Sequence, residues 1–405
     1  MARTVATLPS GSRITDFLSF GVLARAFPIA KVHEALAATG KASQRQRDLP
    51  AHVVVYYVLA LSLYMQASSR EVLRCLLEGL QWLRLGAPVS IAGKSGISQA
   101  RTRLGSAVMQ HLHDGLVGPI ATVDSKGSWY RHWRLVSLDG STLDVADEPD
   151  NEAAFGRPGA SQGEAAFPQI RFMSLVENGT HVLFGSQMAD IATGEIALGK
   201  TVLPALKPGM LCLADRYFFG YEMWKMAMAT GADLVWRVRR NAILKADEPC
   251  PDGSYISHIY LSAKDRRHKT RGIAVRVVDY NLDGVDGAED IYRLVTTIMD
   301  PAAAPAEELA ALYHERWEIE SALDELKTHL RGSRIILRSR TPDLVRQEFY
   351  GLLMLHYAVR GVMHEAALKA DIDPDRLSFL HAVRVIRRKF LAAGAISPLR
   401  QGRLA

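Results

Sequence analysis

A stretch near the carboxyl end, residues 312–330, constrains this chain more than any other feature. It contains no proline or glycine, and its apolar spacing predicts one helix. Because each helical residue advances by roughly 100°, Tyr313, Arg316, Glu320 and Lys327 would share a stripe about 60° wide. A carboxylate fixed beside cations on one face suits a metal ion with phosphates held next to it. An adjacent apolar stripe would dock the helix on a core: Leu312, Ile319, Leu323, Leu326 and Leu330.

The bulk composition is that of a soluble globular protein, with 48% hydrophobic and 23% charged residues in 405. Such a length allows two or three domains, each with its own core. The longest apolar run, residues 52–65, is too short to cross a bilayer and predicts a buried helix. The cysteines are too few for a disulfide framework, and no secretory signal opens the chain. We therefore expect a cytoplasmic protein without a membrane segment.

Positive charge is concentrated at the two ends of the chain. The net charge is +6, and basic residues outnumber acidic ones before residue 50 and again after residue 331. The last predicted helix, residues 376–390, carries Arg387 and Arg388. Basic ends around a near-neutral middle indicate binding to a polyanion such as DNA. For either run alone, a solvated helix face is the alternative.

The first 125 residues are expected to be helical. Within them, residues 92–104 open with a Gly- and Ser-containing turn and continue into a helix that bears Gln99, Arg101 and Arg103. A helix, a short turn and a second basic helix predict a helix-turn-helix in which these three residues contact DNA. An ordinary helical hairpin is the alternative. The other expected helices cover residues 14–26, 29–39, 52–65 and 70–85.

From about residue 129 the pattern changes to short strands, and the expected fold class is mixed α/β. Asn178 and Gly179 join two of these strands in a hairpin. Three antiparallel strands, a parallel strand, a helix and another strand are the order of an RNase H-like domain. The expected parts are an all-helical N-terminal DNA-binding domain (1–125), the first part of the RNase H-like core (126–238), a β-rich insertion with a basic loop at 264–271 (239–304), the second part of the core with the Glu320 helix (305–341), and C-terminal helices for DNA binding or dimerisation (342–405).

Two aspartates are candidates to join Glu320. Asp139 lies in the middle of the first strand of this core, and Asp215 ends the fourth. These strands are neighbours in an RNase H-like sheet, and ligands bind at the carboxyl ends of strands. Taken singly, Asp139 suits a turn, Asp215 a helix cap and Glu320 a surface charge. Asp144 would replace Asp139 if the strand register differs.

Three carboxylates would suit a two-metal site. Phosphodiester cleavage develops charge on the entering and the leaving oxygen, and two divalent ions about 4 Å apart stabilise both. Magnesium prefers oxygen ligands and keeps several waters. We therefore expect Asp139, Asp215 and Glu320 to bind two Mg²⁺ ions, with Mn²⁺ as a possible substitute.

The spacing Tyr-x2-Arg-x3-Glu-x6-Lys, with Glu320 as its acid, resembles the signature of the insertion-sequence-4 family of DDE transposases. The segments that begin at Asp139 and surround Asp215 resemble the family's first two catalytic motifs, and the helical start resembles its N-terminal domain. The resemblance implies an enzyme that binds terminal inverted repeats, pairs them as a homodimer and joins them to target DNA by metal-dependent strand cleavage and strand transfer. It leaves open whether a hairpinned DNA end forms, and it places the protein at the nucleoid.

Further residues are expected at the DNA. Arg316 and Lys327 share the stripe of Glu320 and are expected to contact phosphates near the cut. Tyr313 is expected to hydrogen-bond a phosphate or to position a neighbouring side chain. Arg157, in a stiff loop after the first strand, either touches the DNA end or belongs to a simple surface turn.

Two other functions use the same residues. An RNase H-like nuclease would cut DNA with this triad without joining it. A DNA-binding regulator descended from a transposase would have no need of the acids. The intact triad disfavours the regulator, and the insertion together with the Tyr313–Lys327 spacing disfavours the nuclease.

Overall fold

The computed structural model describes residues 18–43, 49–65, 67–82, 93–160, 163–281, 291–330 and 336–394. The chain forms two compact units, each assembled from segments distant in sequence. The helical unit contains the described parts of Met1–Val117, Leu143–Gln169 and Asp324–Ala405, and the sheet unit contains those of Gly118–Thr142 and Ile170–Leu323. The five segment boundaries expected from the sequence stay a prediction.

The helical unit is built around α3 (Ala51–Leu63), the buried helix predicted from the apolar run. Its residues from Val53 to Leu63 are all buried, as expected for a helix that is apolar all round. A Cβ added at Gly351 would lie 3.0 Å from Val58 Cγ1, so α13 approaches α3 closely. The other elements of this unit are α1 (Leu18–Ala26), α2 (Ile29–Ala38), α4 (Ser69–Trp82), α5 (Lys94–Leu104), α6 (Ser106–Leu116), α7 (Pro149–Phe155), the ribbon β3 (Gly159–Ala160) and β4 (Gly163–Glu164), α13 (Pro342–Ala370), a 3-10 turn (Pro374–Arg376) and α14 (Phe379–Gly394).

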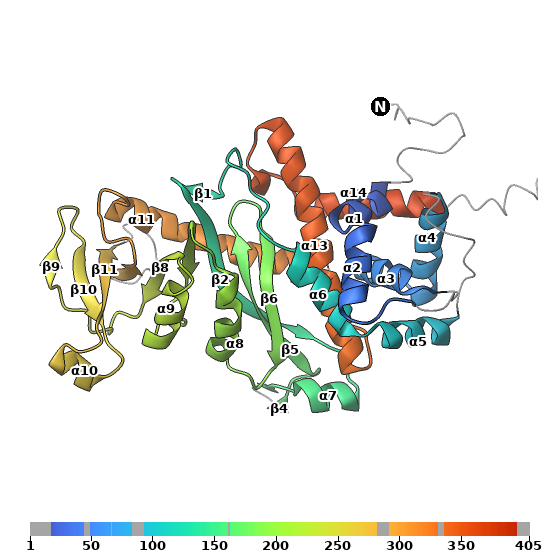
Figure 1. Ribbon diagram of the computed structural model, residues 1–405, viewed down its shortest axis with the longest axis horizontal. Coiled ribbons are helices and arrows are strands. Elements are labelled where there is room, and N and C mark those ends of the chain that lie inside the picture. The colour runs from blue at the N-terminus through green and yellow to red at the C-terminus, as the bar shows by residue number, and fades with distance from the viewer. Residues whose placement is uncertain are drawn as a thin grey trace, which may run out of the picture. The chain divides into compact units, whose positions relative to one another are not determined.

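The sheet unit contains one mixed sheet with the strand order β6-β5-β2-β7-β8-β12-β11-β10-β9 (Figure 1). Strands β5 and β6 form the predicted antiparallel hairpin, while β2, β7 and β8 run parallel. This is the RNase H-like arrangement that the sequence predicts. The strands are β1 (Trp129–Tyr130), β2 (Trp133–Asp144), β5 (Gln169–Glu177), β6 (Val182–Asp190), β7 (Met210–Ala214), β8 (Asp233–Val238), β9 (Glu248–Pro249), β10 (Tyr255–Ile259), β11 (Ile273–Tyr280) and β12 (Tyr292–Thr296).

The strands of the expected β-rich insertion extend the same sheet. Strand β12 pairs antiparallel with β8, and β11, β10 and β9 follow in the same sheet. The loop expected at residues 264–271 is wrong in part, because the short helix α10 (Ala263–His268) occupies it. The Ser262 side chain caps this helix by accepting the Asp265 backbone N–H, a local signal that favours a helix start.

Helices cover both faces of the sheet, and the alternation of β8 shows which face is which. Val235 packs with Leu309 and Tyr313 of α11 (Ala306–Tyr313). Trp236, the next residue, points to the other face and meets Trp224 of α9 (Tyr221–Met228) edge-on, with ring centroids 5.2 Å apart. Helix α8 (Glu195–Val202) lies beside α9 (Figure 1). Trp236 is therefore a core residue.

The helix predicted for residues 312–330 is present but is not one regular α-helix. After α11 the chain makes a 3-10 turn (His314–Trp317), then α12 (Glu318–Asp324), then a π-helix (Glu325–Leu330). The single-helix prediction was wrong because tertiary contacts override the local propensity at both changes of winding. In the 3-10 turn, the Asn178 side chain donates a hydrogen bond to the Glu315 carbonyl, 2.7 Å away. In the π-helix, the Glu325 carboxylate accepts two hydrogen bonds from Arg360.

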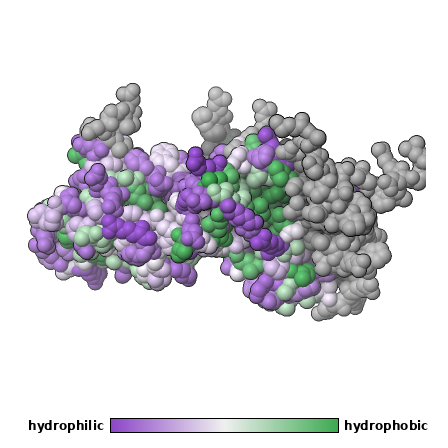
Figure 2. Space-filling model, turned by 90° about the horizontal axis from the view of Figure 1, so that it is seen from above, coloured by the Kyte–Doolittle hydropathy of each residue, from purple (hydrophilic) through white to green (hydrophobic). Residues whose placement is uncertain are grey.

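Among the described residues, no helix combines the length and apolarity needed to cross a bilayer. On the face shown in Figure 2, hydrophilic and hydrophobic residues are intermixed over the coloured part.

Candidate active site

The two aspartates are brought together by the parallel pairing of β2 and β7. Leu138 of β2 is the register partner of Ala214 of β7, so Asp139 and Asp215 occupy the next pair of positions. Neighbouring strands lie about 4.8 Å apart. Asp139 and Asp215 also follow Leu135 and Leu213 at the two-residue period, so they are on the sheet face that α11 covers.

Arg316 completes the site by reaching all three acids. Its Nη1 lies 3.7 Å from Asp139 Oδ2, and its Nη2 lies 4.0 Å from Asp215 Oδ2 and 3.3 Å from Glu320 Oε1. The three carboxylates therefore converge on one guanidinium, although up to 181 residues separate them in the sequence. The Arg316 side chain is only 8% exposed, whereas those of Asp139, Asp215 and Glu320 are 30%, 32% and 46% exposed. The acids thus face open space that Arg316 itself does not.

The Asp139 carboxyl has a raised pKa. Burial raises its pKa from 3.8 to about 6, and the negative charges of Asp215 and Glu320 add to the rise. The Gly140 backbone N–H, which donates to Asp139 Oδ1 at 2.8 Å, and the Arg316 guanidinium lower the pKa but do not cancel the effect of burial. One guanidinium lies near three carboxyl groups, and this ratio leaves room for a bound cation.

Tyr313 acts within the protein. Its side chain is 7% exposed, and its hydroxyl donates to the Ala214 carbonyl at 3.3 Å, one residue before Asp215. Burial raises the pKa of the phenol well above its usual range, so it stays protonated and keeps donating. Of the two roles expected for Tyr313, this contact favours the positioning of a neighbouring group.

Sequence reasoning read Asn178 only as a turn residue, but it links the strand of Asp139 to the helix of Glu320. The Asn178 side chain is fully buried. Its Oδ1 accepts a hydrogen bond from Ser137 Oγ at 2.9 Å, and its Nδ2 donates to the Glu315 carbonyl at 2.7 Å. The next residue, Gly179, donates its N–H to the Glu318 carboxylate. The β5–β6 turn therefore fixes the helix that carries Glu320 against β2, and we name residues 177–181 the hairpin clamp.

Gly140 shows how tightly β2 is held beside its acid. A Cβ at this position would come within 2.1 Å of Met173 Sδ and 2.6 Å of the Phe172 carbonyl oxygen. Any side chain at Gly140 would therefore push β2 away from β5 and displace Asp139. The position of Asp139 in β2 therefore requires a glycine as the next residue.

Arg237 is a further residue that sequence reasoning missed. It follows Trp236, the register partner of Ala214, so it holds the position next to Asp215 across β7 and β8. Its guanidinium lies over the Tyr292 ring, 4.6 Å from the centroid. Three neighbouring parallel strands thus place Asp139, Asp215 and Arg237 in one row. This row can be recognised only from the strand register, which the sequence alone does not supply.

The alternative first ligand, Asp144, is used elsewhere. It ends β2, and its Oδ1 accepts a hydrogen bond from Gln169 Nε2 at 2.7 Å. Within β2, Asp139 is the residue that contacts Arg316.

The other residues predicted at the DNA lie in the helical unit. Lys327 is half-buried in the π-helix. Arg157 ties its own loop together by hydrogen bonds to Glu152 Oε2 and to the Ala165 carbonyl, both 3.0 Å. Arg387 donates to the Leu63 carbonyl at 2.9 Å and to the Leu330 carbonyl at 2.7 Å, so it satisfies two helix ends. The Arg388 side chain lies outside the described residues.

Helix α5 presents its polar residues in two directions. Gln99 and Arg103 are exposed, but Arg101 is 8% exposed and donates hydrogen bonds to Ser339, Leu344 and Gln347. This placement gives Arg101 a structural role and does not favour the DNA contact expected for it. The turn of the helix-turn-helix hypothesis, residues 83–92, lies outside the described residues.

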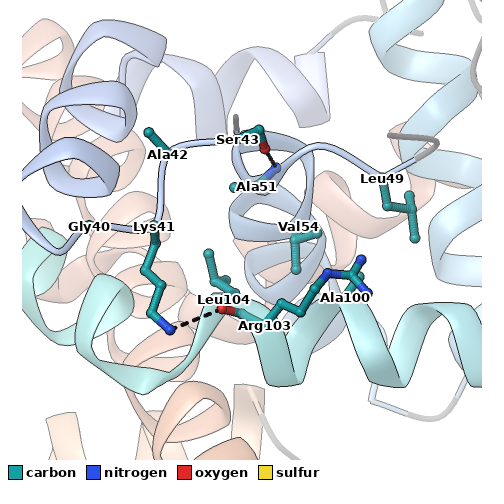
Figure 3. Close-up of a pocket in the computed structure, with 10 residues that line it drawn as sticks. All are labelled: Gly40, Lys41, Ala42, Ser43, Leu49, Ala51, Val54, Ala100, Arg103 and Leu104. Carbon is teal, nitrogen blue, oxygen red and sulfur yellow. Dashed lines mark hydrogen bonds between the residues drawn. The ribbon is translucent and has the colours of Figure 1, made fainter. Parts of the chain in front are cut away.

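Arg103 instead borders a cavity of about 320 Å³ (Figure 3). The Lys41 side chain reaches its backbone and donates to the Arg103 carbonyl at 3.1 Å. Two basic side chains therefore lie at this cavity, where α5 meets the segment after α2.

Two families of known proteins match this chain. Residues 17–114 match the family described as the insertion element 4 transposase N-terminal domain, and residues 133–357 match the transposase DDE domain. The chain is 26% identical over 374 residues to the transposase InsG for insertion sequence element IS4 of Escherichia coli K12, covering 91% of this chain and 82% of InsG.

Two more distant similarities were found. The chain is 21% identical over 224 residues to the putative transposase InsZ of the same organism, covering 53% of this chain and 70% of InsZ. Among solved structures, a chain of the cryo-EM structure of a piggyBac transposase synaptic complex with hairpin DNA aligns with a TM-score of 0.47 and 11% identity, covering 96% of this chain and 82% of that one.

Proposed function

This chain belongs to the insertion-sequence-4 family of DDE transposases, and we propose that it moves an insertion sequence by metal-dependent cleavage and transfer of DNA strands. One observation carries the proposal: Asp139, Asp215 and Glu320 surround a single guanidinium on one face of the sheet. The family establishes a transposase, while the strand chemistry below is our inference from the site.

The donor set of this site fits divalent metal ions of the magnesium type. All three candidate ligands are carboxylates, which supply the hard oxygen atoms that Mg²⁺ prefers. They are partly exposed, so waters and a phosphate have access to the remaining coordination positions. Burial raises the pKa of Asp139, with smaller contributions from Asp215 and Glu320, and a bound cation would favour its carboxylate form. When bound, two such ions would stabilise charge on the entering and leaving oxygens of the phosphodiester.

The chain's own residues prepare the site for that chemistry. Arg316 keeps three like charges together, and it remains beside them as a cation for the developing charge on the phosphate. Tyr313 fixes the backbone just before Asp215, and Asn178 fixes the helix that carries Glu320. These fixed groups hold the carboxylates in place, so little reorganisation is needed during the reaction.

The proposed substrates are double-stranded DNA at the terminal inverted repeats and at the target. We assign Lys327 and Arg103 to phosphate contacts, with Gln99, Arg157, Arg387 and Arg388 as weaker candidates. The proposal also includes a homodimer that pairs the two ends. The cytoplasmic, nucleoid-associated location stays a prediction.

The direct test uses DNA that carries the inverted repeats flanking the gene. Purified protein should nick these ends with Mg²⁺ or Mn²⁺, and should join pre-cut ends to a target plasmid. Asp139→Asn, Asp215→Asn and Glu320→Gln should each abolish cleavage while DNA binding in a gel-shift assay persists.

The test also separates the alternatives. Cleavage without joining would make the protein a nuclease. Binding without cleavage under any metal condition would make it a regulator. Full activity in a chelator would end the metal proposal.

A further inference from the structure

A concave surface lined by Arg216, Arg239, Arg240 and Asn241 lies in the sheet unit, with a volume of about 630 Å³. We name it the arginine groove. None of its residues belongs to the site described above or was expected at the DNA. All four side chains are exposed, so they do not serve the packing of the core.

The groove begins next to the acidic site. Arg216 directly follows Asp215, beyond the carboxyl end of β7. Arg239 and Arg240 follow Val238, the last residue of the parallel neighbour β8. Both groups therefore leave the sheet at its carboxyl edge, where ligands of open sheets bind. A molecule held at Asp215 would extend into the groove if it were longer than a single phosphate.

The chemistry of the groove selects for an anion. Among the described residues that line it, three are cationic and none is acidic. The cationic character continues along the chain, because residues 234–246 also contain Arg237 and Lys245 and no Asp or Glu. Guanidinium groups offer several N–H donors in a plane and bind phosphate oxygens with two hydrogen bonds. The amide of Asn241 adds a donor of the kind that also contacts the sugar-phosphate backbone.

We propose that the arginine groove binds the backbone phosphates of a DNA strand next to the phosphate that is cut. The inference rests on the proposed function, because it takes the acids to mark the scissile phosphate. The phosphates belong either to the transposon end or to the target strand that receives it. Their chemistry is the same, and the experiment distinguishes the two sources.

The test compares the double variant R239A/R240A with Lys207→Ala. Lys207 precedes β7 and is exposed at the amino edge of the sheet, so its removal changes net charge in the same unit away from the groove. Binding of a fluorescent duplex of the flanking inverted repeat is measured in Ca²⁺ from about 50 to about 300 mM salt. Each phosphate contact contributes about 0.9 to the magnitude of the slope of log K against log salt. If the end occupies the groove, the double variant should lower this slope by about two, and Lys207→Ala should leave it unchanged.

A second arm measures strand transfer of pre-cut ends into a plasmid. If the target occupies the groove, end binding and cleavage by the double variant stay at the wild-type level and transfer falls at least tenfold. R239K/R240K, which keeps the charge, should recover part of the lost activity. Thermal melting of each variant reports whether it folds as the wild type does.

The inference is overturned if the double variant melts like the wild type and matches it in salt slope, cleavage and transfer. This outcome differs from failure of the proposed function, in which the wild-type protein itself would show no metal-dependent cleavage. The slope in Ca²⁺ is measured without turnover, so it tests binding of the transposon end to the groove whether or not the protein cleaves. Binding of the target strand is tested by the transfer arm.

Discussion

Replacing Asp139 by Asn should stabilise the metal-free protein at neutral and alkaline pH, although it removes a proposed metal ligand. The reason lies in the charge of the site. In the folded protein, burial and the neighbouring acids disfavour the Asp139 carboxylate, whereas in the unfolded chain the carboxylate is solvated. Asn keeps the shape of the side chain and carries no charge at any pH.

The magnitude follows from the pKa. The folded-state pKa of Asp139 is about 6, above the ordinary value of 3.8. A carboxyl whose pKa is raised on folding makes its full contribution to the free energy of unfolding below pH 3.8. This contribution is lost as the pH rises through about 6. At about 1.4 kcal/mol per pKa unit, the loss reaches about 3 kcal/mol. Because 30% of the side chain is exposed, water screens the charge and this value is the upper end.

The assay is urea unfolding in chelator, repeated between about pH 4 and about pH 8. The free energies of unfolding of wild type and Asp139→Asn should agree at the acid end, and the variant should become more stable through pH 6. Glu222→Gln, which removes an exposed carboxylate on α9, is the matched control and should show no such divergence. Adding Mg²⁺ should stabilise the wild type by about 2.7 kcal/mol at one hundred times the dissociation constant, and the variant less.

Two results would refute this reasoning. A stability difference that is constant across the pH range would show that the Asp139 charge is not the cause. A variant that is less stable than the wild type at about pH 8 in chelator would show that the folded site favours the carboxylate.

Three further outcomes are expected. Glu320→Gln should lose metal-dependent cleavage and keep DNA binding, and Ca²⁺ should inhibit the wild type; equal loss of binding in a gel shift would make the acid structural. Asn178→Ala should cost about 2 to 4 kcal/mol of stability, because the Ser137 hydroxyl and the Glu315 carbonyl each lose a buried partner. It should also lower kcat more than KM for the DNA end, and an unchanged kcat would separate the hairpin clamp from catalysis. Lys327→Ala should reduce the salt slope of DNA binding by roughly one, and an unaltered slope would remove Lys327 from the phosphate.

The sequence was most informative where the signal is local, as in a long apolar run or a pair of turn residues. The buried helix at 52–65 is signalled by a long apolar run and the Asn178-Gly179 hairpin by its turn residues, and the structure contains both. The meeting of Asp139 and Asp215 could be predicted because their two strands are neighbours in an RNase H-like sheet, and β2 and β7 do pair. Here a one-residue error in register would have exchanged the two faces of the sheet.

The misses have tertiary causes. The regular helix expected at 312–330 changes winding where it forms hydrogen bonds with two buried side chains from other segments, Asn178 and Arg360. Arg101 is a basic residue on a polar helix, as a DNA-contacting residue would be, but its side chain is buried against α13. No property of its neighbours in sequence indicates this burial. The position of Arg237 could not be predicted either, because only the strand register places it beside Asp215.

The continuity of the sheet from β2 to β10 has a mechanical consequence. Strand β12 supplies the hydrogen-bonding partners of β8 from Val235 to Val238, so the inserted strands are coupled to β8 and β7 without an intervening linker. A strain applied to the β10–β11 hairpin passes through two ladders to β8, and β8 carries Arg237 beside Asp215. Excising the insertion would also leave β8 as a bare edge, open to pairing with another chain. The insertion is thus suited to pass a displacement of its own strands to the strand that carries Arg237, as a tilt of that strand.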